Sequence, residues 1–276
     1  MNPHSKLGLG TVQFGQAYGV SNTTGQVPKE EAARILARAA AGGVTLLDTA
    51  ANYGDAEAVL AELNTAPFRI VTKTISVKNG VEAVIARARQ SAQTLKPDTL
   101  LVHAAADLED AKLWPALQAL KTEGLFRKIG ISTYYNDNPA ALAARFKPDV
   151  MQLPFSILDQ RLLADGSLKR LSELGVEVHA RSLFLQGLLF MEEPPEKLAW
   201  ATRELRSVKS HIIKTGIPLL SAALHFVLQR PEIAIGLVGV TSVKELDAIL
   251  AAPVPPGLNW SGCAIRDEKI LTPSLW

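Results

Sequence analysis

Residues 44–53 read VTLLDTAANY, an apolar run that ends in an aspartate and is followed five residues later by a tyrosine. Seven further runs have a similar character: KLGLGTV (6–12), RIVTKTI (69–75), TLLVHA (99–104), KIGIS (128–132), DVMQLPF (149–155), VEVHARS (176–182) and IAIGLVGV (233–240). Most of these runs are continuously apolar rather than alternating, a pattern typical of parallel strands that are covered by helices.

Longer amphipathic stretches separate the strand candidates. We predict helices over residues 28–41, 55–63, 81–95, 108–122, 139–145, 165–174, 196–229 and 243–251. Eight strand–helix units predict an α/β protein with the (β/α)8 TIM-barrel fold, in which eight parallel strands are surrounded by outer helices. No linker rich in Gly, Ser or charge divides the chain. We therefore expect a single domain over residues 1–276, with the Pro-rich tail 252–276 packed over one end of the barrel.

Composition narrows the possible partners and compartments. The chain has 276 residues and a formal net charge of +2, which predicts neither a nucleic-acid nor a membrane partner. No apolar segment is long enough for a membrane span, and the start MNPHSKLGLG lacks an apolar signal core, so we expect a cytoplasmic protein. Cys263 is the only cysteine, and no His, Asp or Glu cluster has metal-ligand spacing, so no metal site is expected. Nothing in the sequence indicates an oligomeric state.

Ionisable side chains stand at the ends of successive strand candidates. Asp48, Lys73 and His103 end their runs, Gln152 lies late in another, and Tyr53 follows on a loop. In parallel barrels the carboxyl ends of the strands meet at one face, where active sites are built. A polar residue within an apolar run is costly unless it is paired or used. Each of these residues alone is more often structural, but their joint placement predicts a common catalytic pocket.

Eight segments together resemble the aldo-keto reductase superfamily. They are LGLGTVQFG, LLDTAANYGDAE, VTK, LLVH, KIGIS, QLPFSILDQR, LFLQGLL and LVGVTSVKEL, which cover nearly the whole chain in the family's order. The resemblance implies a catalytic tetrad of Asp48, Tyr53, Lys73 and His103.

Carbonyl reduction explains why these four residue types serve together. Hydride addition to carbon leaves charge on the oxygen, so a proton donor must reach that oxygen. A phenol holds its proton tightly near neutral pH, and a nearby ammonium eases its release. In this interpretation Tyr53 is the general acid, Lys73 supplies the positive charge, Asp48 holds Lys73, and His103 orients the substrate oxygen.

The glycines of GLGTVQFG do not complete a Rossmann fingerprint. Gln13 occupies the third glycine position of G-x-G-x-x-G, and no acidic residue ends a strand about 20 residues later. The resemblance instead implies nicotinamide contacts from the first strand end and from the fifth and sixth strands, a loop that wraps the pyrophosphate, and a loop at the adenosine phosphate. The expected cofactor residues are Gly10, Thr11, Val12, Asp48, Ser132, Gln152, Arg181, Ser182, Phe184, Gln186, Gly187, Leu188, Gly239, Val240, Thr241 and Glu245.

Two positions depart from the family pattern. Arg181 stands where a tyrosine usually stacks on the nicotinamide; its planar guanidinium can also stack, can attract an anionic substrate, or can pair with a nearby acid. Glu245 stands where NADP-preferring members carry an arginine, although Lys244 is adjacent. We favour NADP(H) as the cofactor and keep NAD(H) as a close second.

The predicted function is nicotinamide-dependent reduction of a carbonyl in a small aldehyde, ketone or sugar, or oxidation of the corresponding alcohol. The substrate is thus expected to be a small molecule, with Tyr18, Tyr134, Phe155, Phe184, Trp260 and Trp276 as candidate pocket walls. One alternative is a non-catalytic, nicotinamide-bound redox-sensing subunit of a larger assembly. Another is a barrel isomerase or lyase that uses no nicotinamide.

Overall fold

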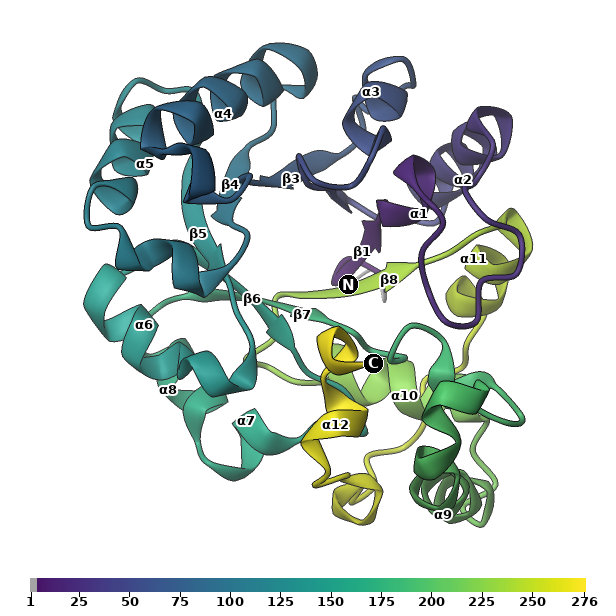
Figure 1. Ribbon diagram of the computed structural model, residues 1–276. Helices are drawn as coiled ribbons and strands as arrows, with labels where there is room; N and C mark the ends of the chain where they lie inside the picture. Colours follow the sequence, from purple (N-terminus) through teal and green to yellow (C-terminus); the bar gives the residue numbers. More distant parts are fainter. Residues whose placement is uncertain (1–3) are drawn as a thin grey trace.

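In the computed structural model, which describes residues 4–276, eight parallel strands close into one barrel (Figure 1). The strands are β1 (Leu7–Gly10), β2 (Leu46–Asp48), β3 (Arg69–Lys73), β4 (Thr99–Val102), β5 (Lys128–Ser132), β6 (Val150–Pro154), β7 (Glu177–Arg181) and β8 (Ile235–Gly239). Each strand pairs with the next, and β1 closes the ring against β8. The predicted TIM barrel is therefore confirmed. The prediction of a cytoplasmic protein used the first ten residues of the sequence. Residues 1–3 of that stretch lie outside the described residues.

Helices surround the strands (Figure 1). They are α1 (Val12–Gly15), α2 (Lys29–Ala41), α3 (Ala56–Ala61), α4 (Val81–Leu95), α5 (Leu113–Thr122), α6 (Pro139–Phe146), α7 (Arg161–Ala164), α8 (Ser167–Glu173), α9 (Thr202–Ile213), α10 (Leu219–Leu228), α11 (Val243–Leu250) and α12 (Glu268–Leu271). Helix α2 shows how sequence sets such an element. Its buried residues Ala32, Ile35, Leu36 and Ala39 recur at helical spacing, and Pro28 stands directly before its first turn.

Three predicted helices differ from the observed ones because local backbone signals interrupt them. The stretch 196–229 is not one helix: α9 and α10 are separated where Gly216 has φ +74° and Pro218 precedes α10. The helix predicted over residues 165–174 corresponds to α8 and begins at Ser167, after Gly166 with φ +79°, while the separate short helix α7 before it was not predicted. The helix predicted from residue 108 begins at Leu113, after a 3-10 turn over Ala105–Glu109.

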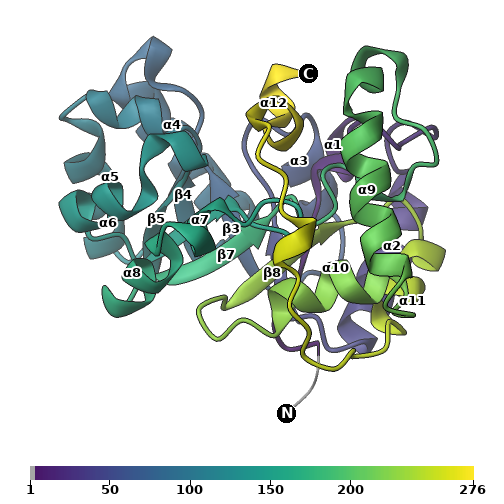
Figure 2. The ribbon, with the colours of Figure 1, turned by 90° about the horizontal axis from the view of Figure 1, so that it is seen from below.

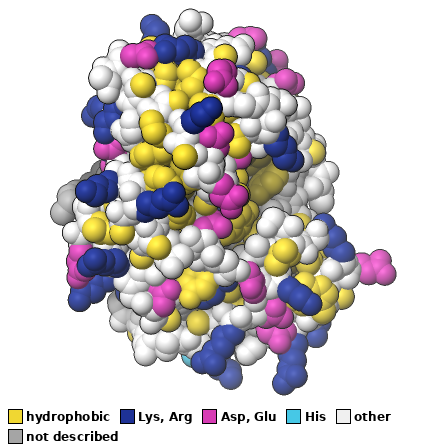
Figure 3. Space-filling model, turned by 60° about the vertical axis from the view of Figure 1, so that its left-hand side comes forward, with side chains coloured by type: hydrophobic (Ala, Val, Ile, Leu, Met, Phe, Trp, Pro, Cys, Tyr) yellow, Lys and Arg dark blue, Asp and Glu magenta, His cyan; other side chains and the backbone are white. Residues whose placement is uncertain are grey.

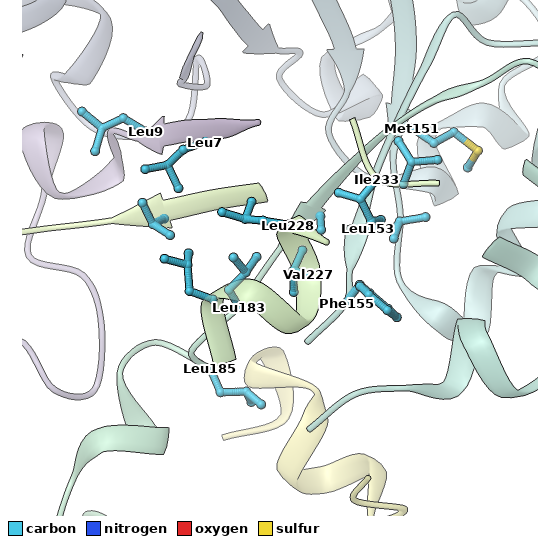
Figure 4. Packing of buried hydrophobic residues seen from close by; sticks show 14 of the residues in the cluster. Leu7, Leu9, Met151, Leu153, Phe155, Leu183, Leu185, Val227, Leu228 and Ile233 are labelled. Atoms are coloured by element: carbon cyan, nitrogen blue, oxygen red, sulfur yellow. The ribbon is translucent and has the colours of Figure 1, made fainter. Parts of the chain in front are cut away.

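Two apolar clusters hold the barrel together. Leu46, Val71, Leu101, Val150, Ile235 and Leu237 form the smaller one, which we call the barrel plug because all six come from the strands. The larger cluster lies between strands and helices; Figure 4 shows part of it, with Leu7 and Leu9 of β1 and Val227 and Leu228 of α10. The plug fills the barrel so that a ligand site can form only above it, at the strand ends.

The C-terminal tail packs against loops that follow strands. Ile265 N donates to Leu158 O at 2.9 Å, and Gln160 Nε2 donates to Trp260 O at 2.8 Å, so the tail lies on the loop after β6. Trp260 and Cys263 are buried there. Figure 2 shows α12 and the C-terminus together at the top of that view. Burial raises the pKa of the Cys263 thiol to about 11.

Charges of both signs are interspersed on the face drawn in Figure 3. None of the helices in residues 4–276 combines the length and the apolar character of a membrane span. Within the same range, no group of three or more His, Cys, Asp and Glu side chains is placed to hold a metal ion.

Candidate active site

A polar layer stands directly above the barrel plug. Asp48, Lys73, His103 and Gln152 each follow a plug residue by two positions in the sequence. Because side chains two residues apart in an extended strand point to the same side, the strands that fill the barrel with apolar groups also bring these four to its mouth. Asp48 and Lys73 end β2 and β3 and His103 directly follows β4, as the sequence predicted, whereas Gln152 is the middle residue of β6.

Asp48 and Lys73 form a buried ion pair at the centre of this layer. Lys73 Nζ donates to Asp48 Oδ2 at 2.7 Å and to Thr49 O at 2.9 Å, and it lies 3.3 Å from the Tyr53 hydroxyl oxygen. Gln152 Nε2 donates to Asp48 Oδ1 at 2.6 Å, so both carboxylate oxygens are satisfied. The ammonium is thus fixed beside the phenol by acceptors that surround it.

Tight packing of the loop after β2 places the Tyr53 ring. Gly54 has φ +51°, and a Cβ there would lie 2.2 Å from Gly15 O. A Cβ at Gly15 would lie 1.8 Å from Tyr53 O. Both glycines are therefore required for the loop to rest on α1. The Tyr53 ring then meets the His103 ring edge-on, with centroids 5.7 Å apart.

Burial and neighbouring charges set the protonation states. Burial acts to lower the pKa of the Lys73 ammonium, but Asp48 and Tyr53 oppose it, and the net shift is upward. Burial, with Lys73 and Arg181 nearby, lowers the pKa of His103 to about 4. Near neutral pH the pocket therefore holds a cationic lysine and an uncharged imidazole, which can offer one N–H to a substrate oxygen.

A cavity of about 660 Å³ opens at this layer and extends to α11. Most of the predicted site residues line it: Gly10, Val12, Asp48, Tyr53, His103, Ser132, Gln152, Arg181, Ser182, Phe184, Gln186, Gly187, Gly239, Val240, Thr241 and Glu245. Lys73 lies behind Asp48 and Tyr53, outside the lining.

Two residues predicted to contact the cofactor lie away from the cavity. Thr11 is fully buried, and its hydroxyl donates to Asp48 O at 3.0 Å. Leu188 is turned into the apolar cluster between strands and helices. Thr11 thus ties β1 to β2, and Leu188 anchors the loop that contains it.

The predicted aromatic walls are correct in part. Tyr18, Tyr134 and Phe184 line the cavity. Phe155 instead stacks on Phe226 in the core with centroids 5.3 Å apart. Trp260 is buried and Trp276 donates to Lys269 O, both within the tail packing.

Several lining residues were not predicted from the sequence: Gln13, residues 19 and 21–24, Phe190, Leu220, Leu237, Val238, Ala248 and Ile249. Gln13 and residues 19–24 follow β1. Their position after a strand end could have identified them as lining residues, because the loops that follow the strands build the active site of such a barrel.

The segment after β7 has an unusual backbone. Ser182, Leu185 and Gln186 have φ of 61°, 49° and 54°, and Gly187 has φ 84°. Non-glycine residues seldom adopt this region, and three of them within five residues mark a constrained segment. Gln186 Nε2 donates to the Tyr18 hydroxyl at 3.1 Å, and Ser21 Oγ donates to Gln186 O at 3.1 Å. The segments 18–21 and 182–187 therefore meet beside the cavity.

Comparisons with known proteins agree with this geometry. The model of the Aldo/keto reductase family matches residues 6–254. The chain belongs to the aldo/keto reductase family. It is an NAD(P)H-dependent oxidoreductase, and the family uses NADP(H). The redox-sensing alternative is not favoured by these findings.

Individual relatives of this reductase span most of its length. It is 28% identical over 278 residues to L-galactose dehydrogenase from Arabidopsis thaliana, covering 90% of this chain and 84% of the relative. It is 26% identical over 283 residues to an uncharacterised oxidoreductase from Mycobacterium tuberculosis, again covering 90% and 84%.

Solved structures of the family share the fold. The holo form of an aldo-keto reductase from Bacillus halodurans aligns with a TM-score of 0.72 at 20% identity, covering 94% of this chain and 89% of that one. A Bombyx mori aldo-keto reductase in complex with NADP aligns with a TM-score of 0.66 at 18% identity, covering 94% and 86%.

Unpaired polar atoms of this reductase fit a bound nicotinamide nucleotide. His103 Nδ1 and Gln13 Oε1 are buried without a hydrogen-bond partner, and both residues line the cavity. Orphaned buried groups of this kind usually find their partner in a ligand or water. The volume lies within the range of small-molecule and cofactor sites. The cavity is therefore suited to an elongated polar ligand that reaches from His103 to α11.

The end of the cavity at α11 is arranged differently from a free anion site. Glu245 Oε2 accepts from Thr241 N at 2.7 Å, and Glu31 Oε1 accepts from Val243 N at 2.8 Å. Ser242 Oγ accepts from Glu245 N at 3.3 Å. The N–H groups of Thr241, Val243 and Glu245 at the start of α11 are therefore occupied by this chain's own side chains rather than free for a phosphate.

Proposed function

We propose that this reductase transfers hydride between a nicotinamide cofactor and the carbonyl of a small aldehyde, ketone or sugar, or runs the reverse oxidation. One observation carries the proposal: the Lys73 ammonium lies 3.3 Å from the Tyr53 hydroxyl oxygen. The same ammonium is paired with the Asp48 carboxylate. A phenol beside a fixed cation is suited to give a proton to a carbonyl oxygen, because the cation stabilises the phenolate left behind.

The other residues of the pocket have supporting roles in this proposal. A bound nicotinamide supplies the hydride. The uncharged His103 donates a hydrogen bond to the substrate oxygen and orients the carbonyl toward Tyr53. Asp48, held by Lys73 and Gln152, keeps the ammonium in place through both of its oxygens. In the reverse direction Tyr53 takes the alcohol proton.

Cofactor contacts are proposed for residues that line the cavity. Ser132 and Gln152 would contact the carboxamide. The pyrophosphate would lie at Ser182, Phe184, Gln186 and Gly187, and the adenosine end at Gly239, Val240, Thr241 and Glu245. We propose NADP(H) as the cofactor, which the family uses, with NAD(H) as the second candidate because of Glu245.

The test compares the wild type with Tyr53→Phe on a panel that contains benzaldehyde, simple ketones and sugars. L-Galactose is included with the oxidised cofactors because of the plant relative's activity. Turnover is followed by the absorbance of the reduced cofactor, with both NADP(H) and NAD(H). We expect Tyr53→Phe to lower kcat by about 10²- to 10⁴-fold, since it removes the general acid. Cofactor binding, measured by fluorescence titration, should persist.

Tyr135→Phe is the matched control. Tyr135 lies beside Arg161, away from the cavity lining, and its variant should keep wild-type turnover. Full activity of Tyr53→Phe on a substrate of the wild type would exclude Tyr53 as the acid. Cofactor binding without turnover of any carbonyl or alcohol would favour the redox-sensing alternative.

A further inference from the structure

The cavity wall carries one guanidinium or ammonium group, that of Arg181, among the residues 4–276. The cavity wall also carries two carboxylates, and both already accept hydrogen bonds. Asp48 accepts from Lys73 and Gln152, and Glu245 accepts from Thr241. Because the opposite charges of Lys73 and Asp48 cancel, Arg181 sets the net charge near the polar layer. The tetrad end of the cavity is therefore electropositive and attracts anions.

Arg181 has only neutral partners. Its Nη2 donates to Thr133 O at 3.2 Å, its Nη1 donates to Ser182 Oγ at 3.3 Å, and its guanidinium carbon lies 4.4 Å from the centroid of the Tyr134 ring. Among the described residues no carboxylate forms an ion pair with it, so the interpretation that Arg181 serves an intramolecular ion pair is wrong.

These contacts orient the guanidinium without neutralising it. The side chain is half-buried at the end of β7, and two of its donor nitrogens are positioned by the loop after β5 and by its own neighbour. A guanidinium stays charged and has five N–H donors in a planar fork that matches a carboxylate. A positioned, half-buried cation with unused donors is best satisfied by an anionic ligand.

Arg181 also lines the same cavity as Tyr53 and His103. Its charge adds to burial and to Lys73 in lowering the pKa of His103, and it acts on Tyr18 across the cavity. An anion bound by Arg181 would therefore be held near the imidazole that orients the carbonyl.

We propose that Arg181 binds the carboxylate of the substrate, so that this reductase acts on small aldehydes or ketones that carry an acidic group. The inference rests on the proposed reductase activity and adds the chemical class of its substrate. The carboxylate accepts hydrogen bonds from the guanidinium, while the carbonyl at the other end of the molecule reaches Tyr53 and His103. The same cation could attract a phosphate of the cofactor, and the experiment separates these two sources of negative charge.

The experiment uses two aldehydes that differ by one carboxylate, 4-carboxybenzaldehyde and benzaldehyde, with the wild type, Arg181→Gln and Arg181→Lys. The readout is the ratio of kcat/KM for the acidic aldehyde to that for the neutral one. We expect the wild type to favour the acidic aldehyde and Arg181→Gln to lower the ratio by about 10- to 100-fold, the range for a charge-assisted pair. Arg181→Lys should restore part of the ratio because it keeps the charge but loses the fork.

A binding measurement accompanies the kinetics. Benzoate and benzamide are titrated against the protein saturated with oxidised cofactor, followed by tryptophan fluorescence or calorimetry. Benzoate should bind more tightly than benzamide to the wild type, and Arg181→Gln should remove the difference. Arg203→Gln, an exposed arginine of α9 outside the cavity lining, should keep both the ratio and the benzoate affinity of the wild type.

The outcomes separate this inference from the proposed function. Turnover of both aldehydes with equal kcat/KM in the wild type would leave the reductase standing and overturn the substrate class. An equal loss for both aldehydes in Arg181→Gln, with a raised Kd for the cofactor, would assign the cation to a cofactor phosphate instead. Failure to turn over either aldehyde would count against the reductase proposal. The difference in affinity between benzoate and benzamide would then still test whether Arg181 binds a carboxylate.

Discussion

His103 is held uncharged by its surroundings. Its pKa is about 4 in the folded protein, because burial and Lys73 oppose the imidazolium, against 6.5 for an unperturbed histidine. The unfolded chain therefore binds a proton between these two values that the folded protein does not bind. The stabilising contribution of His103 is complete above pH 6.5 and is lost as the pH falls toward about 4.

We predict that His103→Gln weakens this pH dependence. The free energy of unfolding, from urea titrations at about pH 7 and about pH 5, should fall less on acidification in the variant than in the wild type. His211→Gln alters an exposed histidine and should leave the wild-type difference in place. A pH dependence unchanged in His103→Gln would contradict the assignment.

Lys73 and Asp48 depend on each other because both are buried. Lys73→Met leaves the Asp48 carboxylate with Gln152 as its remaining side-chain partner, and we expect a loss of about 3–5 kcal/mol in the free energy of unfolding. Adding Asp48→Asn removes the uncompensated charge and should recover part of that loss. A double variant less stable than Lys73→Met, measured by urea unfolding at neutral pH, would argue against a coupled pair.

Among the helices, we expect the start of α11 to set the affinity of the cavity for the 2′-phosphate of NADP(H). Glu245→Ala frees the Thr241 N–H and removes a carboxylate from the cavity wall. In the proposed cofactor arrangement, NADP(H) should then bind about 2- to 10-fold more tightly relative to NAD(H), because the helix N-terminus favours negative charge.

The measurement is the ratio of the two dissociation constants, obtained by fluorescence titration. Asp247→Ala is the matched control, since Asp247 lies on the same helix but pairs with Arg38 outside the cavity. A shift shared equally by NADP(H) and NAD(H) would show that the 2′-phosphate does not lie at this loop.

At the scale of the whole molecule, the tail and the barrel share one apolar cluster. Trp260, Cys263 and Ile265 of the tail belong to the same cluster as Leu7 and Leu9 of β1. We therefore expect one cooperative unfolding transition. Trp260 and Trp276 in the tail contribute to the tryptophan fluorescence of the protein. This fluorescence should follow the same denaturant curve as far-ultraviolet circular dichroism. A tail signal that is lost at lower denaturant concentration than the helices would show that the tail unfolds independently.

Local sequence patterns specify the barrel and the polar layer at its mouth. Continuous apolar runs specify buried parallel strands, and the alternation of side chains along a strand places Asp48, Lys73 and His103 on the same side as the plug residues beneath them. This placement follows from local patterns, so it could be read without coordinates. The break at Gly216 was also present locally, but a helical pattern of apolar residues obscured it.

Which polar groups already have a partner depends on contacts between segments that are remote in the chain. Gln152 reaches Asp48 across 104 residues, Glu245 folds back onto Thr241, and Arg181 meets a carbonyl and a ring rather than an acid. Thr11 and Leu188 turned away from the cavity although their neighbours line it. Hydrogen bonding depends on distances of a few ångströms between side chains that are remote in the chain, and residue type or spacing does not fix those distances.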